Sequence, residues 1–295
     1  MKKKLRFIIN PIAGTRYKNL RPKAIEKFID REQFDFDIAY TERQGHAEEL
    51  AAKAAEEGID IVAIAGGDGS VNEAARGLKY SKTALAIIPI GSGNGVARKL
   101  NIPLKPYKAL QLINTGKVLL MDGGSVNDEF FLMSPGLGFD AAMLQNFDKF
   151  KMRGVWGYLK SLFQTSKTFK AFDVVLNLDG KEIKERVYSI LLSNIGQLGY
   201  GITFDKASKV DDGYLELVTM KEFPKWKILW YILVAFFLNP AKASIISIYR
   251  FKQMTGVISA KQCLQIDGDY KKEVESIKAN VVEKVVNVIV PSNYN

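Results

Sequence analysis

With 295 residues, 47% of them hydrophobic, the chain can bury one large core or two modest ones, and we expect two domains. A single cysteine, Cys263, excludes an internal disulfide, and the longest apolar-rich stretch, residues 226–238, is shorter than the roughly 20 residues of a membrane-spanning helix. The net charge of +10 favours an anionic partner, but the dispersed basic residues lack the aromatic alternation typical of nucleic-acid binding.

The first 120 residues predict an α/β domain. Lys2 to Lys4 run directly into an apolar segment too short for a signal peptide, so we expect a cytoplasmic protein without a transmembrane segment. Short β-branched runs predict strands at residues 5–9, 34–40, 59–65 and 84–89, and apolar residues at helical spacing predict helices at 21–31 and 45–58. This alternation is typical of a parallel sheet flanked by helices.

Three of these strands run into glycine-rich turns, "NPIAG" at 10–14, "GGDG" at 66–69 and "GSGNG" at 91–95. The carboxyl ends of parallel strands share one edge of a sheet, where a helix start presents unpaired amides to an anion. Asp68 would repel a phosphate there unless a cation stands between them, which points to a metal-dependent nucleotide site or to a base. Taken alone, "GGDG" fits an ordinary capped turn equally well.

After about Met121 the pattern changes to strands separated by turns. Asp179-Gly180 is a strong hairpin signal, and further strand-like runs lie at 172–185, 214–220, 254–260, 263–273 and 285–291. Helices are expected at 155–169 and 226–238, the second as a core helix or as a lipid-facing one. The second half therefore predicts a mainly antiparallel domain.

The late motif "IDGD" places Asp267 and Asp269 two residues apart, so both would face the same side of a regular strand. One could accept the proton of an acceptor hydroxyl while the other positions that group or helps to bind a metal. Without further motifs, a solvated hairpin turn with two ordinary carboxylates is the simpler interpretation.

Five motifs in order, "NPIAG", "GGDGSVNE", "PIGSGNGVAR", "VDDGYLEL" and "IDGD", resemble the diacylglycerol kinase catalytic-domain family, which includes bacterial lipid kinases and sphingosine kinases. The resemblance implies a kinase that uses ATP and Mg²⁺. It also implies a doubly wound α/β ATP-binding domain, set at residues 1–121, and an antiparallel β-sandwich lipid-substrate domain at 122–282. The tail, about 283–295, could return to the first domain.

The resemblance also implies roles for individual residues. Asp68 would organise the phosphate and magnesium environment, Arg98 would hold charge near the transferred phosphate, and either Asp267 or Asp269 would be the base. A structural magnesium site would take Asp212 and the backbone oxygens of Lys209 and Tyr214. The implied ATP-binding residues are Asn10, Pro11, Ile12, Ala13, Gly14, Thr41, Gly66, Gly67, Asp68, Gly69, Ser70, Val71, Asn72, Ser92 and Asn94.

Two departures from the family pattern concern the acceptor. Gly95-Val96 stands where many bacterial diacylglycerol kinases carry Asp-Phe, and the Gly-Ser-Gly-Asn core before it is more similar to sphingosine kinases. Ser70 likewise replaces the usual Thr. Diacylglycerol is the first expectation, and a sphingoid base or ceramide stays open. So do a soluble-substrate kinase resembling NAD kinase and a catalytically silent lipid-binding module. We expect peripheral contact with a membrane that holds the lipid, and the sequence leaves a homodimer open.

Overall fold

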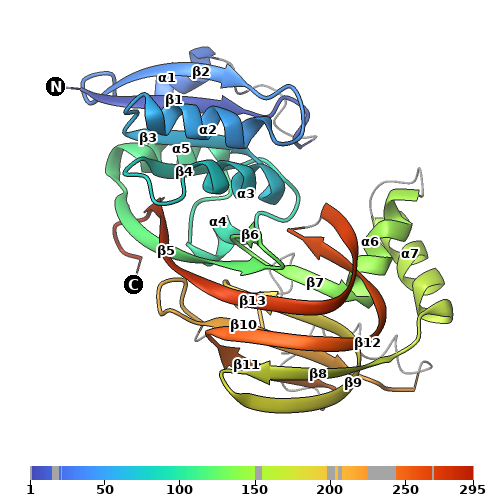
Figure 1. Ribbon diagram of the computed structural model, residues 1–295. Coiled ribbons are helices and arrows are strands. Elements are labelled where there is room, and N and C mark those ends of the chain that lie inside the picture. The colour runs from blue at the N-terminus through green and yellow to red at the C-terminus, as the bar shows by residue number, and fades with distance from the viewer. Residues whose placement is uncertain are drawn as a thin grey trace. The chain divides into compact units, whose positions relative to one another are not determined.

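The computed structural model describes residues 2–14, 20, 22–149, 155–197, 203–204, 208–224, 244–267 and 269–294 (Figure 1). They form two compact units, each with its own hydrophobic core. The N-terminal unit comprises Met1–Gly123 and Val282–Asn295, and the C-terminal unit comprises Gly124–Leu198 and Ile202–Val281. The fold class expected from the sequence, an α/β domain followed by an antiparallel β domain, is confirmed.

The N-terminal unit contains a parallel sheet in the order β13-β4-β3-β1-β2, in which the last part of β13 pairs with β4. Its elements are β1 (Lys3–Ile9), α1 (Pro22–Phe28), β2 (Phe34–Tyr40), α2 (His46–Glu56), β3 (Ile61–Gly66), α3 (Asp68–Gly77), β4 (Ala84–Pro89), α4 (Gly95–Lys99) and α5 (Pro106–Thr115). All four predicted strands are present, although the third begins two residues later than expected because Ile59 and Asp60 still belong to the turn after α2.

Helices cover both faces of this sheet. On one face Leu5, Phe7 and Ile9 of β1 pack with Ile25 of α1 and Ile113 of α5. On the other, α2 and α3 pack on each other and on β3 (Figure 1). The strands β3 and β4 are buried along their whole length, as expected for parallel strands covered on both faces. The sheet is therefore doubly wound.

In its described residues, the C-terminal unit contains antiparallel strands and the helices α6 and α7. After β5 (Lys117–Val126), which begins in the N-terminal unit, its elements are β6 (Glu129–Phe131), β7 (Pro135–Gly138), α6 (Phe139–Lys149), α7 (Val155–Thr168), β8 (Phe172–Leu178), β9 (Lys181–Ser193), β10 (Leu215–Lys221), β11 (Ile246–Phe251), β12 (Gln253–Ile266) and β13 (Asp269–Val290). The chain of β13 passes into the N-terminal unit at Val282.

Two long strands organise this unit. The first halves of β9 and β12 both pair with β8, and their second halves both pair with β7. The strands thereby close around one apolar core (Figure 1). Side chains of β8 alternate between buried and exposed, which is the pattern of an antiparallel strand with one solvated face.

Several predicted elements take a different form. The run predicted at 263–273 is divided, since residues 263–266 end β12 and residues 269–273 begin β13. The run at 254–260 also belongs to β12, and a register shift between Val257 and Gln262 separates the two parts of that strand. The predicted hairpin at Asp179-Gly180 is confirmed: it joins β8 to β9, and both residues have positive φ, 50° and 89°. The helix predicted at 155–169 is α7, and the one predicted at 226–238 lies outside the described residues.

Candidate active site

The three glycine-rich turns follow β1, β3 and β4, which are parallel neighbours in the sheet, so all three lie at the same edge. Hydrogen bonds join the first turn to the second. The Asn10 side-chain amide donates to the Ser70 hydroxyl at 3.0 Å, and the Asn10 backbone N–H donates to the Ala65 carbonyl. Asn10 Oδ1 also accepts the N–H of Ile12, which holds the turn that ends at Gly14.

Asp68 joins the second turn to the third. Its Oδ1 accepts the backbone N–H of Gly95 at 2.7 Å, at the start of α4. The turns approach so closely that a Cβ on Gly91 would lie 2.5 Å from the Cα of Gly67, which only glycine allows. Burial raises the pKa of Asp68, and hydrogen bonds from the backbone N–H groups of residues 94–96 oppose that rise.

The third turn is held by its own side chains. Asn94 has a φ of 52°, and its side-chain amide donates to the Gly91 carbonyl at 2.7 Å. Arg98 Nε donates to the Gly93 carbonyl at 2.9 Å, so the guanidinium lies against the turn that was predicted from the sequence to bind phosphate. Ser92 lies in the same turn and is exposed.

The other implied ATP-binding residues differ in exposure. Ile12 is 88% exposed, whereas Thr41 is buried and donates its backbone N–H to the Ile9 carbonyl. Val71 and Asn72 are buried inside the first turns of α3. Pro11, Ala13 and Gly14 follow β1, Gly66 ends β3, Gly67 caps α3, and Gly69 lies in its first turn. The turn residues are therefore brought together at one edge, while Val71 and Asn72 face the interior.

The two late carboxylates belong to the C-terminal unit. Asp267 has a φ of 50°, so the segment is a turn and the regular strand on which both side chains would share a face is absent here. Asp267 is 7% exposed, its Oδ1 accepts the Ser134 N–H at 2.7 Å, and its own N–H donates to the Ser134 carbonyl. Asp269 is the first residue of β13, paired with Ile266.

A buried polar cluster near Asp267 had no sequence signal strong enough to predict it. Asp140, in the first turn of α6, accepts the Ser189 hydroxyl at 2.5 Å and a hydrogen bond from Gln265, two residues before Asp267. Gly136 leaves space for this carboxylate, since a Cβ there would meet both Asp140 Oδ2 and the Gln265 amide. Burial raises the pKa of Asp140. The cluster fixes the strand that leads into the Asp267 turn.

The implied structural magnesium site has its carboxylate engaged by protein groups. Asp212 Oδ1 accepts the Tyr214 N–H at 3.1 Å, and Asp212 Oδ2 lies 2.5 Å from the Arg250 guanidinium. Lys209 has an exposed side chain. Within the described ranges, no cluster of three or more His, Cys, Asp or Glu side chains has metal-binding geometry. Because both oxygens of Asp212 already have protein partners, the residues of the implied site fit a metal poorly as they stand.

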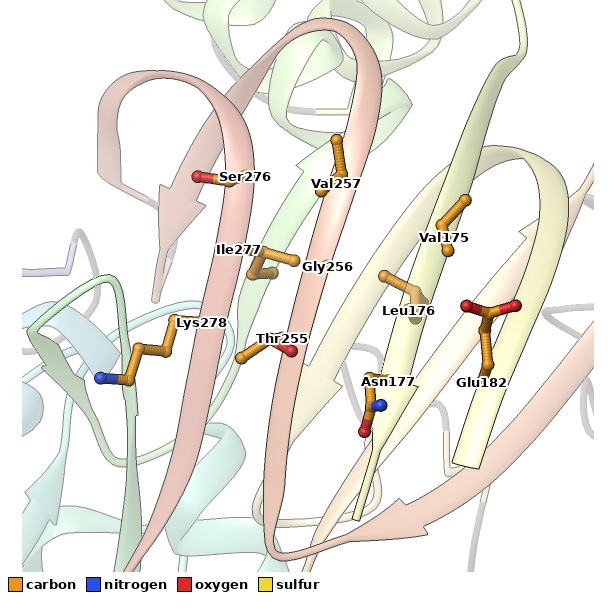
Figure 2. A pocket seen from close by; sticks show the side chains of 10 residues that line it. All are labelled: Val175, Leu176, Asn177, Glu182, Thr255, Gly256, Val257, Ser276, Ile277 and Lys278. Carbon is orange, nitrogen blue, oxygen red and sulfur yellow. The ribbon is translucent and has the colours of Figure 1, made fainter. Parts of the chain in front are cut away.

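A shallow hollow of about 310 Å³ lies elsewhere on the C-terminal unit (Figure 2). Val175 and Val257 face it, 42% and 66% exposed, and Glu182 and Lys278 stand at its rim. The lining residues are Val175, Leu176, Asn177, Glu182, Thr255, Gly256, Val257, Ser276, Ile277 and Lys278. None of them belongs to the predicted ATP-binding, metal or catalytic sets, so this hollow is separate from those residues.

Comparison with known families matches both halves of the chain. The model of the diacylglycerol kinase catalytic domain matches residues 4–126, and the model of the YegS C-terminal NAD kinase beta sandwich-like domain matches residues 134–289. In the part of the chain that the structure describes, no helix is long and apolar enough to span a bilayer.

Similar proteins carry related names. A diacylglycerol kinase of Staphylococcus saprophyticus is 27% identical over 227 residues, covering 75% of this chain and 74% of its own. One of Staphylococcus aureus is 29% identical over 230 residues, covering 75% and 72%. A crystal structure of a diacylglycerol kinase from Bacillus anthracis aligns with a TM-score of 0.76 at 20% identity, over 99% of this chain and 98% of its own. A second solved structure from that organism reaches 0.79 at 24% identity over 99% of both chains, and these two likenesses show a shared fold.

Proposed function

We propose that this chain, which belongs to the diacylglycerol kinase family of lipid kinases, transfers the γ-phosphate of ATP to the hydroxyl group of a lipid. Diacylglycerol is the first candidate for that lipid. The observation that carries the proposal is the arrangement of the three glycine-rich turns at one edge of the parallel sheet, cross-linked by Asn10 and Asp68. Open α/β sheets bind phosphorylated ligands at this edge.

The turns suit the phosphates of ATP. Glycines at 67, 69, 91 and 93 let the backbone approach the phosphates closely, and Arg98, bound to the Gly93 carbonyl, adds a positive charge beside them. Asp68 is half-buried, so its carboxylate can meet a hydrated Mg²⁺, which keeps several of its waters when bound. Bound with ATP, Mg²⁺ would neutralise charge on the phosphates.

The acceptor hydroxyl is a poor nucleophile, because its proton must leave as the new P–O bond forms. A positioned carboxylate that accepts this proton contributes typically 10²- to 10⁴-fold to turnover. We assign this role to the Asp267/Asp269 pair. Asp267 is held by the Ser134 N–H, and Asp269 begins the neighbouring strand, so their turn places two carboxylates in one short segment.

Diacylglycerol is proposed as the acceptor because the similar staphylococcal proteins carry that name. The Gly-Ser-Gly-Asn sequence of the third turn, which is similar to sphingosine kinases, favours a sphingoid base or ceramide as the second candidate. In either case the lipid lies in a membrane, so the enzyme would act as a peripheral protein at that surface.

The proposal is tested by incubating the purified protein with radiolabelled ATP, Mg²⁺ and separate vesicles of diacylglycerol, sphingoid base or ceramide, with soluble NAD as a parallel acceptor. We expect label in phosphatidic acid, and loss of that label when Mg²⁺ is chelated. Label in NAD alone would support the soluble-substrate alternative. ATP binding without transfer to any acceptor would support a silent module.

A further inference from the structure

The loop at residues 209–214, directly before β10, is held in place by contacts with other parts of the chain. Val210 and Leu215, at its two ends, are 1% and 0% exposed. Between them, Gly213 has a φ of 72°, and the Asp212 carboxylate accepts the N–H of Tyr214, two residues on, at 3.1 Å. A side chain that bonds its own backbone two residues on forms an Asx turn, which fixes the loop locally.

Arg250 on β11 approaches this loop from the neighbouring strand. Its guanidinium lies 2.5 Å from Asp212 Oδ2, and its central carbon lies 4.6 Å from the centre of the Tyr214 ring. The strand register also places the buried Glu216 directly opposite Arg250. Arg250 therefore contacts the Asp212 carboxylate, which is the one side-chain ligand that the resemblance implies, and the ring of Tyr214, whose implied ligand is its backbone oxygen.

A guanidinium and a magnesium ion make opposite demands on these residues. Mg²⁺ needs near-octahedral oxygen ligands at roughly 2.1 Å and releases its waters reluctantly. A planar guanidinium instead pairs with a carboxylate and stacks on an aromatic ring. Here Asp212 provides the carboxylate and Tyr214 provides the ring. A dication at Asp212 would also meet the positive charge of Arg250 at close range. The two cations therefore compete for the same carboxylate.

We propose that Arg250 is the built-in cation of the 209–214 loop, so that this loop is ordered by a side chain and does not require a bound metal. The inference is independent of the proposed kinase activity, because it concerns the order of a loop in the C-terminal unit and its readout involves no substrate. The Mg²⁺ that would accompany ATP lies outside it.

The loop offers a direct assay, since Lys209 is exposed and endoproteinase Lys-C cleaves after lysine without needing a metal. The cleavage rate at the 209–210 bond, followed by mass spectrometry, reports how often the loop opens. For the wild-type chain we expect the same rate in Mg²⁺ as in EDTA. Arg250→Met should raise the rate roughly three- to tenfold, since it removes an ion pair and a cation–π contact.

Two further variants keep the result interpretable. Arg250→Lys retains the charge but loses the planar fork and most of the stacking, so its cleavage rate should fall between wild type and Arg250→Met. Arg186→Met removes a surface arginine that pairs with Asp173 and Glu222 in the same unit, and it should leave cleavage at 209–210 unchanged. Circular dichroism confirms that each variant is folded before cleavage is compared.

The alternative has a distinct signature. If the loop takes a metal as the resemblance implies, EDTA should accelerate cleavage of the wild-type chain, Mg²⁺ should reverse this, and Asp212→Asn should abolish the metal effect. That pattern, or an unchanged rate in a folded Arg250→Met variant, would overturn the inference. Protection of Arg250→Met by added Mg²⁺ would support it, since removing the guanidinium frees the carboxylate for a metal.

Discussion

For Asp68 we propose a metal or phosphate role in addition to a structural role that the sequence did not show. Its sequence position suggested a metal or phosphate role, and the structure adds a hydrogen bond from Gly95 that connects two turns. A carboxylate can perform both tasks because its two oxygens point in different directions. An asparagine could perform only the second, since its amide oxygen accepts a hydrogen bond without supplying charge.

This difference gives a prediction at Asp68. Asp68→Asn should keep the melting temperature close to wild type but weaken Mg²⁺-dependent ATP binding, because the acceptor for the Gly95 N–H remains and the charge is lost. Asp68→Ala should also destabilise the protein by about 1–2 kcal/mol, since a part-buried N–H loses its partner. Calorimetry with ATP and Mg²⁺ and thermal melts check both. Equal ATP affinity in wild type and Asp68→Asn would remove the metal role from Asp68.

The late carboxylates make a second prediction. Asp267→Asn and Asp269→Asn are close in size to the native residues, and the variant that loses the base should show turnover lowered by roughly 10²- to 10⁴-fold. ATP affinity should survive, because the glycine-rich turns belong to the other unit. Turnover with the best lipid acceptor, measured beside ATP affinity, separates the two effects. Near-wild-type turnover in both variants would place the base elsewhere.

Asp140 makes a pH-dependent prediction. Burial raises its folded pKa above the unfolded value, so the folded state binds this proton more tightly and the group loses stabilising effect as pH rises through the folded pKa. The stability of wild type relative to Asp140→Asn should therefore decrease as pH rises from the unfolded pKa, about 3.9, through the folded one. Urea unfolding of both proteins across this range measures the difference. A relative stability that rises with pH would contradict it.

At the scale of elements, the turn between β8 and β9 shows how one residue can position more than one strand. Asp179, in the turn between β8 and β9, accepts the backbone N–H groups of Lys252 and Gln253 at 2.9 Å each. Its own N–H donates to the Gln253 carbonyl. The turn that reverses one hairpin therefore also fixes the start of β12.

Asp179→Ala should lower stability by about 1–3 kcal/mol, because it leaves two backbone N–H groups without their acceptor and puts alanine at a φ of 50°. Asp179→Asn is the matched control, since asparagine tolerates this φ and keeps an acceptor oxygen; we expect it to lose less than half as much. Chemical unfolding of the three proteins gives the comparison. An alanine variant as stable as the asparagine one would show that these contacts contribute little.

The elements differ in how well the sequence predicts them, for physical reasons. Strands β3 and β4 of the parallel sheet are continuous apolar runs that lead into glycine-rich turns, and both were predicted, as were β1 and β2. Strand β7, Pro135–Gly138, is four residues with two glycines, and it exists only because β9 and β12 pair with it on either side. Helix α6 follows it at once, without a turn or capping signal. Such elements depend on tertiary partners, which local patterns do not contain.

The candidate site divides in the same way. The glycine-rich turns were predictable because their glycines stand in the sequence directly after apolar strands, and the close approach of Gly91 to Gly67 shows one structural reason for them. Three other contacts join residues that lie 27 to 125 positions apart: the Asp68–Gly95 hydrogen bond, the Asp140–Ser189–Gln265 cluster and the Asp212–Arg250 pair. Strand pairing and tertiary packing bring these residues together, so no local spacing in the sequence predicts them. Arg250 in particular stands in an unremarkable strand, and only the pairing of β10 with β11 brings it to Asp212.

At the scale of the whole molecule, charge and the proposed lipid substrate act together. The chain carries 42 Lys and Arg against 32 Asp and Glu, a net charge of +10. Membranes that contain anionic lipid attract basic residues near their surface by about 1 kcal/mol each. An enzyme whose acceptor is a membrane lipid would gain local substrate concentration from this attraction.

Vesicle binding by the intact protein should therefore rise as anionic lipid replaces neutral lipid, and it should weaken as salt rises from about 0.01 M to 1 M, over which the Debye length falls from about 30 Å to 3 Å. Sedimentation with vesicles of pure phosphatidylcholine and with increasing phosphatidylglycerol measures the bound fraction, and the pure phosphatidylcholine series at each salt concentration is the control. Turnover with diacylglycerol in the same vesicles should follow the bound fraction, because only the bound enzyme meets its acceptor. Equal binding to both vesicle types at every salt concentration would assign membrane contact to apolar insertion, and the positive charge would then have no part in reaching the substrate.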